Sequence, residues 1–185
     1  MPLKPWKLIS SHQDRSYSIF DIRIDHARSP RTGEAHDFYV LESPDWVNVI
    51  PLTPDNEVVL IRQFRHGLRE MTLEIPGGVI EPEDTPLGAA GRELREETGY
   101  QETEIDLLGF VLPNPAFLSN RCYTCVAKDV FIAGEQRQDE KEDIEVILRP
   151  LKDIPQMIRS GEITHALVLA AFYRFYAEYN DGFPK

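Results

Sequence analysis

Residues 86–98 constrain the fold more than any other segment, because the two sides of this stretch have opposite chemistry. Small and apolar side chains recur at the spacing of one helix face: Leu87, Ala90, Gly91, Leu94 and Thr98. Three carboxylates follow the i, i+3, i+4 spacing, which points them the same way: Glu93, Glu96 and Glu97. Thr85 is placed to cap the first turn, Pro86 suits its first position, and Gly99 is placed to end it. The pattern predicts a helix that packs on a core and presents acid on another side.

The acidic side of this predicted helix is a candidate cation site. Like charges on one turn cost roughly a few tenths of a kcal/mol per pair, and no lysine lies between residues 53 and 127 to offset them. Carboxylate oxygens are the ligands that hard divalent cations take. Glycines in the preceding loop, Pro76-Gly77-Gly78, let the backbone approach a ligand and free a carbonyl for coordination. A solvated acidic surface is the alternative interpretation.

These residues together resemble the Nudix box, G-x5-E-x7-R-E-U-x-E-E-x-G-U, in which U is a bulky apolar residue. The match runs from Gly78 to Tyr100 and holds at every fixed position except Asp84, where the family has glutamate. The resemblance implies an α/β/α sandwich around a mixed β-sheet. It also implies hydrolysis of a nucleoside diphosphate linked to another group, with Mg²⁺ or Mn²⁺. The shorter Asp84 is expected to tune the site modestly, or to be replaced by Glu83 after a small loop shift.

The resemblance to the Nudix box implies a role for each matching residue. Glu93 and Glu97 would be direct metal ligands, and Glu96 would bind or position a metal or its water. The backbone carbonyl of Gly77 would be a further ligand. Arg92 would hold the carboxylates in place by ion pairing.

Outside the box, the chain resembles the ADP-ribose and nucleoside-diphosphate-sugar pyrophosphatase branch of the family. The segments 60–65 and 73–78 are similar to the strands that precede the box in that branch. Pro115 lies fifteen residues after the end of the box, where ADP-ribose-type enzymes keep a proline. Residues 139–144 are similar to an acidic loop that supplies a catalytic glutamate, which implies that role for Glu142 first and for Glu140 second.

The chemistry of a diphosphate suggests further site residues. Divalent cations lower the pKa of a bound water, and a carboxylate such as Glu142 can then take its proton or orient it. Arg62 and Arg65 are candidates to clamp the diphosphate because guanidinium matches phosphate bidentately, although a solvated strand face is the alternative. Trp46 is a candidate to stack on a base, with core or dimer packing equally open. His165 is interpreted as a helix-start or packing residue.

Strand-like segments outnumber helical ones along the chain. Apolar alternation and short apolar runs predict strands at 17–27, 36–42, 46–52, 57–64, 72–75, 105–112, 121–132 and 144–150. Helices are predicted at 86–98, 151–159 and 164–179. Because the two types are interspersed without strict alternation, the fold class is predicted to be α+β.

Two regions are expected: a strand-rich N-terminal region, 1–45, and a Nudix hydrolase domain, 46–185. In this branch of the family, N-terminal strands commonly cross to a partner. The resemblance therefore implies that region 1–45 is a dimerisation arm and that the protein is a homodimer.

Composition bears on partners and on cellular location. The net charge of -11, from 20 basic and 31 acidic residues, disfavours binding to nucleic acid. No apolar run approaches the roughly 18 to 20 residues that span a bilayer, and the N-terminus lacks the apolar stretch of a signal peptide. The two cysteines, Cys122 and Cys125, are too few for a disulfide framework. We therefore expect a cytoplasmic protein without nucleic-acid or membrane partners.

The sequence predicts metal-dependent hydrolysis of the pyrophosphate bond of ADP-ribose or a related nucleoside diphosphate sugar, which gives a nucleoside monophosphate and a sugar phosphate. One alternative is a Nudix hydrolase that prefers another substrate, such as GDP-mannose or a dinucleotide. Another is a Nudix module that binds a nucleotide without catalysis. Such modules usually lose one or more of the paired glutamates, and all three are present here.

Overall fold

The computed structural model describes residues 2–138 and 141–179, which divide into two compact units. The first comprises the residues through Pro44 together with Leu112–Arg121. The second comprises Asp45–Val111 and the chain from Cys122 onward. The sequence did not indicate that the segment Leu112–Arg121 groups with the N-terminal residues. The assignment of 1–45 as a dimerisation arm and 46–185 as the hydrolase domain stays a prediction.

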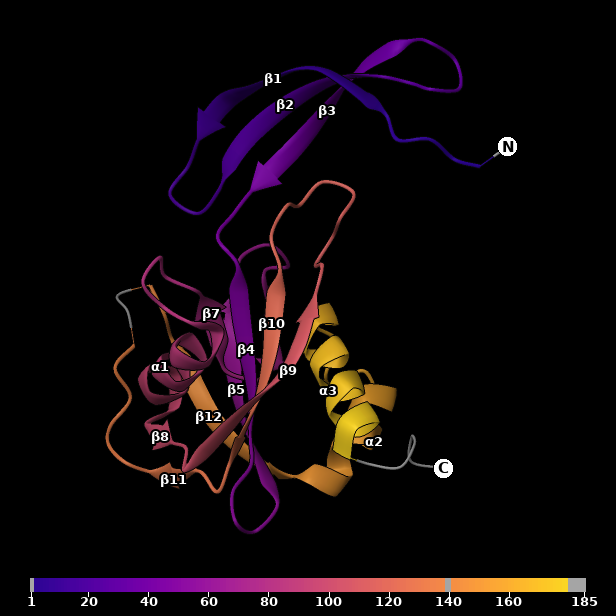
Figure 1. The fold of residues 1–185 in the computed structure, drawn as a ribbon. Coiled ribbons are helices and arrows are strands. Elements are labelled where there is room, and N and C mark those ends of the chain that lie inside the picture. The colour runs from indigo at the N-terminus through magenta and orange to yellow at the C-terminus, as the bar shows by residue number, and fades with distance from the viewer. Residues whose placement is uncertain (1, 139–140, 180–185) are drawn as a thin grey trace. The chain divides into compact units, whose positions relative to one another are not determined.

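The N-terminal unit is a three-stranded antiparallel sheet in the order β1-β2-β3 (Figure 1). Its strands are β1 (Lys7–Ser16), β2 (Asp21–Arg28) and β3 (Ala35–Glu42). The end of β3 is tied to the later segment of this unit, because the Leu41 N–H donates to the Phe117 carbonyl at 2.7 Å. Backbone pairing, with little burial, holds this sheet together within the unit.

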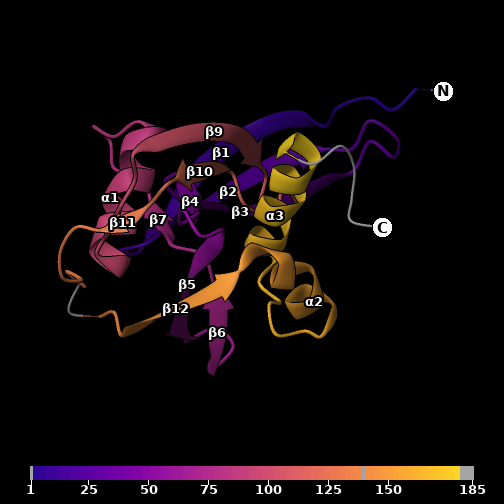
Figure 2. The same ribbon diagram turned by 90° about the horizontal axis from the view of Figure 1, so that it is seen from below.

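The second unit is built on two sheets and one short strand pair. A mixed sheet has the order β7 (Gly77–Val79), β4 (Trp46–Pro51), β10 (Cys122–Lys128), β9 (Glu104–Val111), in which only β4 and β10 pair in parallel. An antiparallel sheet has the order β12 (Ile144–Pro150), β5 (Glu57–Arg65), β6 (Glu70–Glu74), and is seen from below in Figure 2. The short pair is β11 (Phe131–Ile132) with β8 (Tyr100–Gln101).

Two helices cover opposite faces of the mixed sheet (Figure 1). Helix α1 (Pro86–Thr98) contacts β4 and β7, and α3 (Ala166–Tyr179) contacts β4, β9 and β10. A short 3₁₀ turn, η1 (Leu151–Asp153), and α2 (Ile154–Arg159) precede α3. The predicted α+β fold, an α/β/α sandwich around a mixed sheet, is confirmed in this unit. No helix in the described part of the chain is long and apolar enough to cross a membrane.

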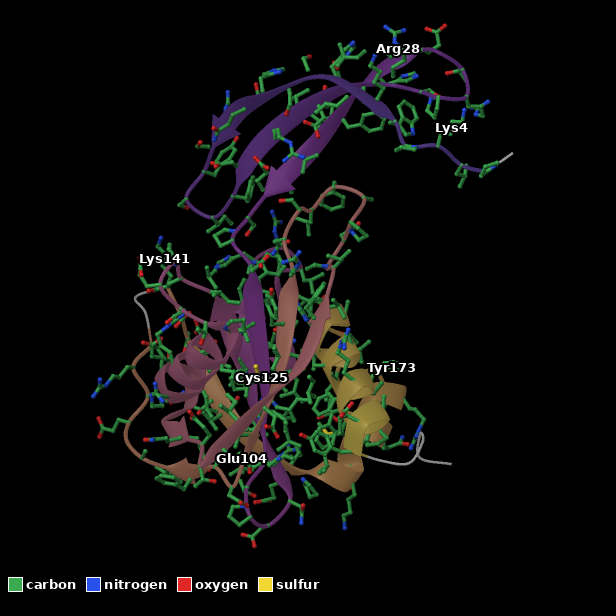
Figure 3. All side chains as sticks on the ribbon, viewed as in Figure 1. Lys4, Arg28, Glu104, Cys125, Lys141 and Tyr173 are labelled. Carbon is green, nitrogen blue, oxygen red and sulfur yellow. The ribbon has the colours of Figure 1, made fainter. Side chains whose placement is uncertain are left out.

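Each face of the mixed sheet has its own hydrophobic cluster. Val47 and Val49 pack with Leu94 in the cluster under α1, whereas Ile50 packs with Phe172 in the cluster under α3. This alternation along β4 follows from the two-residue period of a strand. Figure 3 shows the side chains of both layers. The edge strand of this sheet, β7, is followed by α1 after a loop of residues 80–85.

The two cysteines behave as ordinary buried thiols. Neither Cys122 nor Cys125 forms a disulfide, and both are buried. Burial raises the pKa of each thiol to about 12. At neutral pH both are therefore protonated and unreactive as nucleophiles.

The predicted element boundaries differ from the structure in a few places. The predicted strand 17–27 was wrong at its start, because the Tyr17 N–H donates to the Phe20 carbonyl in a turn and the partner strand β1 lies before it. The predicted strand 121–132 divides into β10 and β11 at Asp129, whose φ is 48°. Leu87, predicted to be in the core, is 38% exposed because it lies in the first turn of α1.

Candidate active site

The caps predicted for α1 are present and fix where its acidic residues lie. The Thr85 hydroxyl accepts a hydrogen bond from the Gly88 N–H at 3.1 Å, and Gly99 ends the helix in the left-handed conformation with φ 74°. A side chain on Gly99 would be strained at that φ. The buried side of the helix is wider than predicted and includes Glu93 and Glu97.

Arg92 forms hydrogen bonds with several groups on the acidic side of α1 and in the loop before it. Its Nε donates to Asp84 at 3.1 Å, and its Nη1 donates to Glu93 at 2.8 Å and to Glu96 at 2.9 Å. Its Nη2 donates to the Val79 carbonyl at 3.0 Å. These bonds tie the loop before the helix to the helix itself. Asp84 reaches Arg92 despite its shorter side chain, so the structure does not use Glu83 in its place.

Glu97 is joined to the loop by Gly77. The Gly77 N–H donates to Glu97 Oε2 at 2.8 Å. In the β4–β7 ladder, the Val49 N–H donates to the Pro76 carbonyl and the Ile80 N–H donates to the Asp45 carbonyl. Because hydrogen-bonded pairs alternate in an antiparallel ladder, Gly77 faces away from β4. Its carbonyl therefore points to the same side as its N–H, which is the side of the carboxylates.

Burial perturbs the two inner carboxyl groups. Burial raises the pKa of Glu93 to about 7, against the opposing effect of Arg92. Burial likewise raises the pKa of Glu97 to about 8, although the Gly77 N–H stabilises its charged form. The negative charge of Glu142 contributes to raising the pKa of both groups, so this exposed residue belongs to the same electrostatic site. The neighbouring donors only partly offset the cost of burying these charged carboxylates, so a nearby cation would stabilise their ionised form.

The donor set fits a hard divalent cation, although the side chains are not arranged around one. Among residues 2–138 and 141–179, no three His, Cys, Asp or Glu side chains are already grouped as a metal-binding set. Glu93 and Glu96 point oxygens at Arg92, while Glu97 points one at Gly77. Every candidate donor is nevertheless an oxygen, as Mg²⁺ and Mn²⁺ prefer. The raised pKa values of two buried carboxyl groups indicate that the site has negative charge to neutralise.

A cavity of about 470 Å³ opens beside this site. It is bounded by Gly77 and Gly78 and is lined mostly by apolar side chains. In its wall, Arg65 makes two bonds to buried Glu74, from Nε at 2.8 Å and from Nη2 at 2.7 Å. The Thr72 hydroxyl donates to the same carboxylate at 2.6 Å. Burial alone would raise the pKa of Glu74, but these donors lower it below its ordinary value.

Comparison with known proteins identifies the family. The NUDIX domain matches residues 43–172. This chain belongs to the Nudix family. It is similar to the ADP-ribose pyrophosphatase of Bacillus subtilis (strain 168), with 29% identity over 86% of each chain. It is also similar to the ADP-sugar pyrophosphatase of Mus musculus, with 35% identity over 72% of this chain and 66% of that protein. A solved ADP compounds hydrolase has the same fold, with a TM-score of 0.85 at 20% identity over 96% of each chain.

The predicted substrate-binding residues of this Nudix chain fall in different places. Trp46 and Arg65 line the cavity. Arg62 does not line it and instead pairs with Glu145 at 3.1 Å. Residues three apart on a strand point to opposite faces, so Arg62 and Arg65 do not act from the same side. Pro115 is exposed in the segment that groups with the N-terminal unit.

The acidic loop is only partly described. Glu142 is exposed and lies close enough to affect the ionisation of the buried carboxyl groups. Glu140, the second candidate base, lies outside the described residues.

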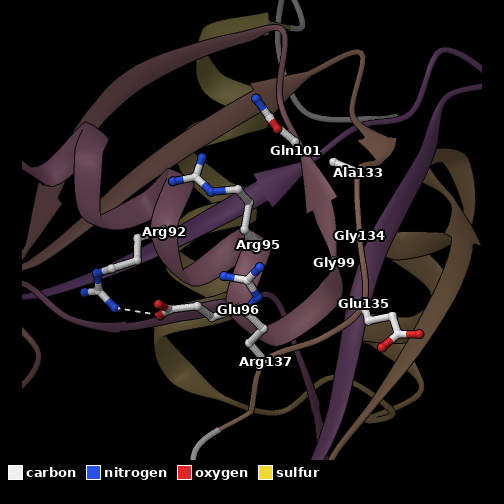
Figure 4. A pocket seen from close by; sticks show the side chains of 9 residues that line it. All are labelled: Arg92, Arg95, Glu96, Gly99, Gln101, Ala133, Gly134, Glu135 and Arg137. Atoms are coloured by element: carbon white, nitrogen blue, oxygen red, sulfur yellow. Dashed lines mark hydrogen bonds and ion pairs between the residues drawn. The ribbon is translucent and has the colours of Figure 1, made fainter.

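A second hollow of about 260 Å³ is lined by both partners of the Arg92–Glu96 ion pair. Figure 4 shows this pair together with Arg95 and Arg137, which line the same hollow. The Arg137 N–H also donates to the Glu96 carbonyl at 2.8 Å. Basic side chains therefore border the C-terminal half of the acidic helix.

Four polar residues of the cavity were not assigned a site role by the sequence: Asn48, His66, Glu74 and His165. Asn48 interrupts the otherwise apolar strand β4, which was the available signal. Glu74 ends a strand that also contains Glu70 and Thr72, so no comparable signal was present there. His165 was interpreted as a helix-start or packing residue, but its Nδ1 is buried at the cavity without a hydrogen-bond partner.

Proposed function

We propose that this Nudix protein hydrolyses the pyrophosphate bond of ADP-ribose or a related nucleoside diphosphate sugar. The products would be a nucleoside monophosphate and a sugar phosphate. The observation that carries the proposal is a pair of buried carboxyl groups with raised pKa values, Glu93 and Glu97. They lie against Gly77 and Gly78, which border a cavity large enough for part of a nucleotide sugar. The names of the relatives, ADP-ribose pyrophosphatase and ADP-sugar pyrophosphatase, support this substrate class.

The metal site of the proposed enzyme consists of Glu93, Glu96, Glu97 and the Gly77 carbonyl, and the cation is Mg²⁺ or Mn²⁺. A cation bound there neutralises phosphate charge and lowers the pKa of a bound water. Arg92 keeps Glu93 and Glu96 beside each other through the bonds from its Nη1. The Gly77 N–H fixes one oxygen of Glu97 and leaves the other for coordination.

Glu142 is the proposed base that takes the proton of the attacking water, with Glu140 as the second candidate. Support comes from its exposure and from its effect on the pKa of Glu93 and Glu97. A carboxylate within hydrogen-bond reach of the attacking water can accept its proton.

The cavity supplies the proposed contacts to substrate. Arg65 donates from Nε and Nη2 to Glu74. Its Nη1 makes no hydrogen bond among the described residues, so this nitrogen can donate to a phosphate oxygen. Trp46 provides an aromatic face for stacking. Arg62 is the weaker of the two predicted phosphate clamps because Glu145 holds it on the other face. Pro115 stays a prediction for specificity.

The proposed enzyme is a cytoplasmic homodimer with no nucleic-acid or membrane partner. The N-terminal unit exposes large apolar side chains: Trp6, Leu8, Ile9, Phe38 and Tyr39. A partner chain that covered them would remove this apolar surface from water. The two free, buried cysteines agree with a reducing compartment.

A substrate panel tests the proposed function. The purified protein is incubated with Mg²⁺ and ADP-ribose, ADP-glucose, GDP-mannose, UDP-glucose, NADH, diadenosine polyphosphates or 8-oxo-dGTP, and products are separated by chromatography. We expect AMP chiefly from ADP-ribose. A preference for GDP-mannose or a dinucleotide would overturn the specificity and keep the chemistry, whereas no turnover of any compound would support the non-catalytic alternative. An unchanged kcat in a Glu142→Gln variant would show that Glu142 is not the base.

A further inference from the structure

Two buried polar atoms lack hydrogen-bond partners at the same cavity. Asn48 is 7% exposed, and its Nδ2 donates to the Leu167 carbonyl at 3.3 Å, but its Oδ1 has no partner. The Nδ1 of His165 is also buried without a partner. Both residues line the cavity that Gly77 and Gly78 border.

Unpartnered buried groups are uncommon in folded proteins because burial removes their bonds to water. Four other side chains in the described part of the chain carry such an atom: Glu102, Asn120, Thr124 and Arg174. None of these four lines the cavity. Asn48 and His165 are therefore distinguished by sharing one concave surface beside the metal-binding residues, and a ligand in that cavity would satisfy both.

We propose that Asn48 and His165 bind hydroxyl groups of the sugar attached to the diphosphate, which makes this part of the cavity a sugar subsite. Asn48 Oδ1 can only accept a hydrogen bond, while His165 Nδ1 donates or accepts according to its tautomer. A sugar carries several neighbouring hydroxyls that both donate and accept, whereas an adenine offers one amino group as donor. The sugar therefore matches two separate polar atoms better than the base does.

The position of the pair agrees with this assignment. Gly77 bonds Glu97 and also borders the cavity. A sugar attached to a diphosphate held at the carboxylates can therefore extend along the cavity wall that contains Gly77. An electrostatic interaction with His165 also contributes to lowering the pKa of Glu74, which places His165 near the Arg65–Glu74 pair. The wall thus combines a cationic group for phosphate, from Arg65, with hydrogen-bonding side chains for hydroxyls, from Asn48 and His165. The inference rests on the proposed hydrolysis of a nucleoside diphosphate sugar.

The test compares two substrates that differ only in the sugar: ADP-ribose and the methyl ester of ADP. Turnover of ADP-ribose by the wild-type protein tests the proposed function, and the ratio of kcat/KM for the two substrates tests the subsite. In Asn48→Ala and in His165→Ala, we expect kcat/KM for ADP-ribose to fall about tenfold, which corresponds to one lost hydrogen bond. For the methyl ester we expect a change below about twofold. A His165→Asn variant, which keeps a polar atom near the position of Nδ1, should recover part of the loss.

Asn120→Ala is the matched control for loss of a buried asparagine. Asn120 is 2% exposed, its Nδ2 donates to the Pro44 carbonyl at 3.1 Å, and its Oδ1 is unpartnered, but it does not line the cavity. We expect Asn120→Ala to lower the melting temperature as Asn48→Ala does while leaving the substrate ratio unchanged. Equal losses on both substrates in the Asn48 and His165 variants would overturn the subsite and indicate a structural role. An unchanged ratio in the His165→Ala variant would also overturn it, even if the Asn48 variant failed to fold.

Discussion

Replacing Glu97 with glutamine tests two effects of this carboxylate separately: its contribution to kcat and its effect on the free energy of unfolding. Glu97 is 3% exposed and accepts a hydrogen bond from the Gly77 N–H. Glutamine has the same shape and keeps an acceptor for that N–H, so the fold should be retained. The variant loses a negatively charged metal ligand. We expect kcat with Mg²⁺ to fall by about a hundredfold or more.

The same substitution should stabilise the metal-free protein in a pH-dependent way. The folded protein raises the pKa of Glu97 from 4.5 to about 8, chiefly by burial. Between these values the folded state holds more protons than the unfolded state, so the free energy of unfolding falls as pH rises. The difference between the pKa values corresponds to a cost of about 3 kcal/mol at pH 7 and about 1 kcal/mol at pH 5. Glutamine does not ionise and avoids this cost.

Thermal unfolding in EDTA measures this effect at pH 5 and pH 7. For a chain of this length, about 3 kcal/mol corresponds to a gain of roughly 6 to 12 °C at pH 7, and the gain should shrink to a few degrees at pH 5. Glu104→Gln is the control, because Glu104 is an exposed partner of Lys128 and lies outside the site. A Glu97→Gln variant that unfolds at the wild-type temperature at pH 7 would refute the burial argument. Wild-type turnover in this variant would refute the metal-ligand assignment.

Three further substitutions test the packing around the site. Arg92→Lys removes the planar group that joins Asp84 to Glu93, so activity should fall about 10- to 100-fold, measured as kcat across a Mg²⁺ titration. Gly78→Ala places a Cβ 2.5 Å from Glu93 Oε1, so Mn²⁺ affinity measured by electron paramagnetic resonance should weaken about tenfold or more; unchanged affinity would contradict the clash. Leu94→Ala opens a cavity at a fully buried position and should cost about 2–5 kcal/mol in urea unfolding, whereas a loss below about 1 kcal/mol would show that the core closes around it.

Helix α1 was predictable to the residue because its signals are local. The Thr85 cap, Pro86 in the first turn and Gly99 at the end act on the helix itself, and the structure has the helix at Pro86–Thr98. Arg92, Glu93 and Glu96 lie within about one helical turn, so their spacing already indicated that Arg92 meets both carboxylates. Local spacing therefore predicted the ion pairs around Arg92, whereas the metal-ligand roles of the glutamates stay a prediction.

Features that depend on distant segments were not predictable in the same way. Strand β1 is exposed throughout and mostly polar after Leu8 and Ile9, and only its backbone pairing with β2 makes it a strand. The cavity joins Asn48 on β4 to His165 before α3, and these residues are more than a hundred positions apart in the chain. Their approach depends on α3 packing across the mixed sheet. By contrast, the two-residue period of a strand was enough to predict that Arg62 and Arg65 point to opposite faces of the sheet.

The burial of Glu93 and Glu97 links the stability of the fold to the chemistry of the site. Both residues lie on the wide buried side of α1, next to Leu94, so the helix cannot pack on the sheet without also removing these carboxyl groups from water. In the absence of a cation, protons and Arg92 satisfy them, as their raised pKa values indicate. A divalent cation must displace those protons, so its affinity should increase as pH rises toward about 8. The packing that destabilises the metal-free protein at alkaline pH is therefore the same packing that favours cation binding there.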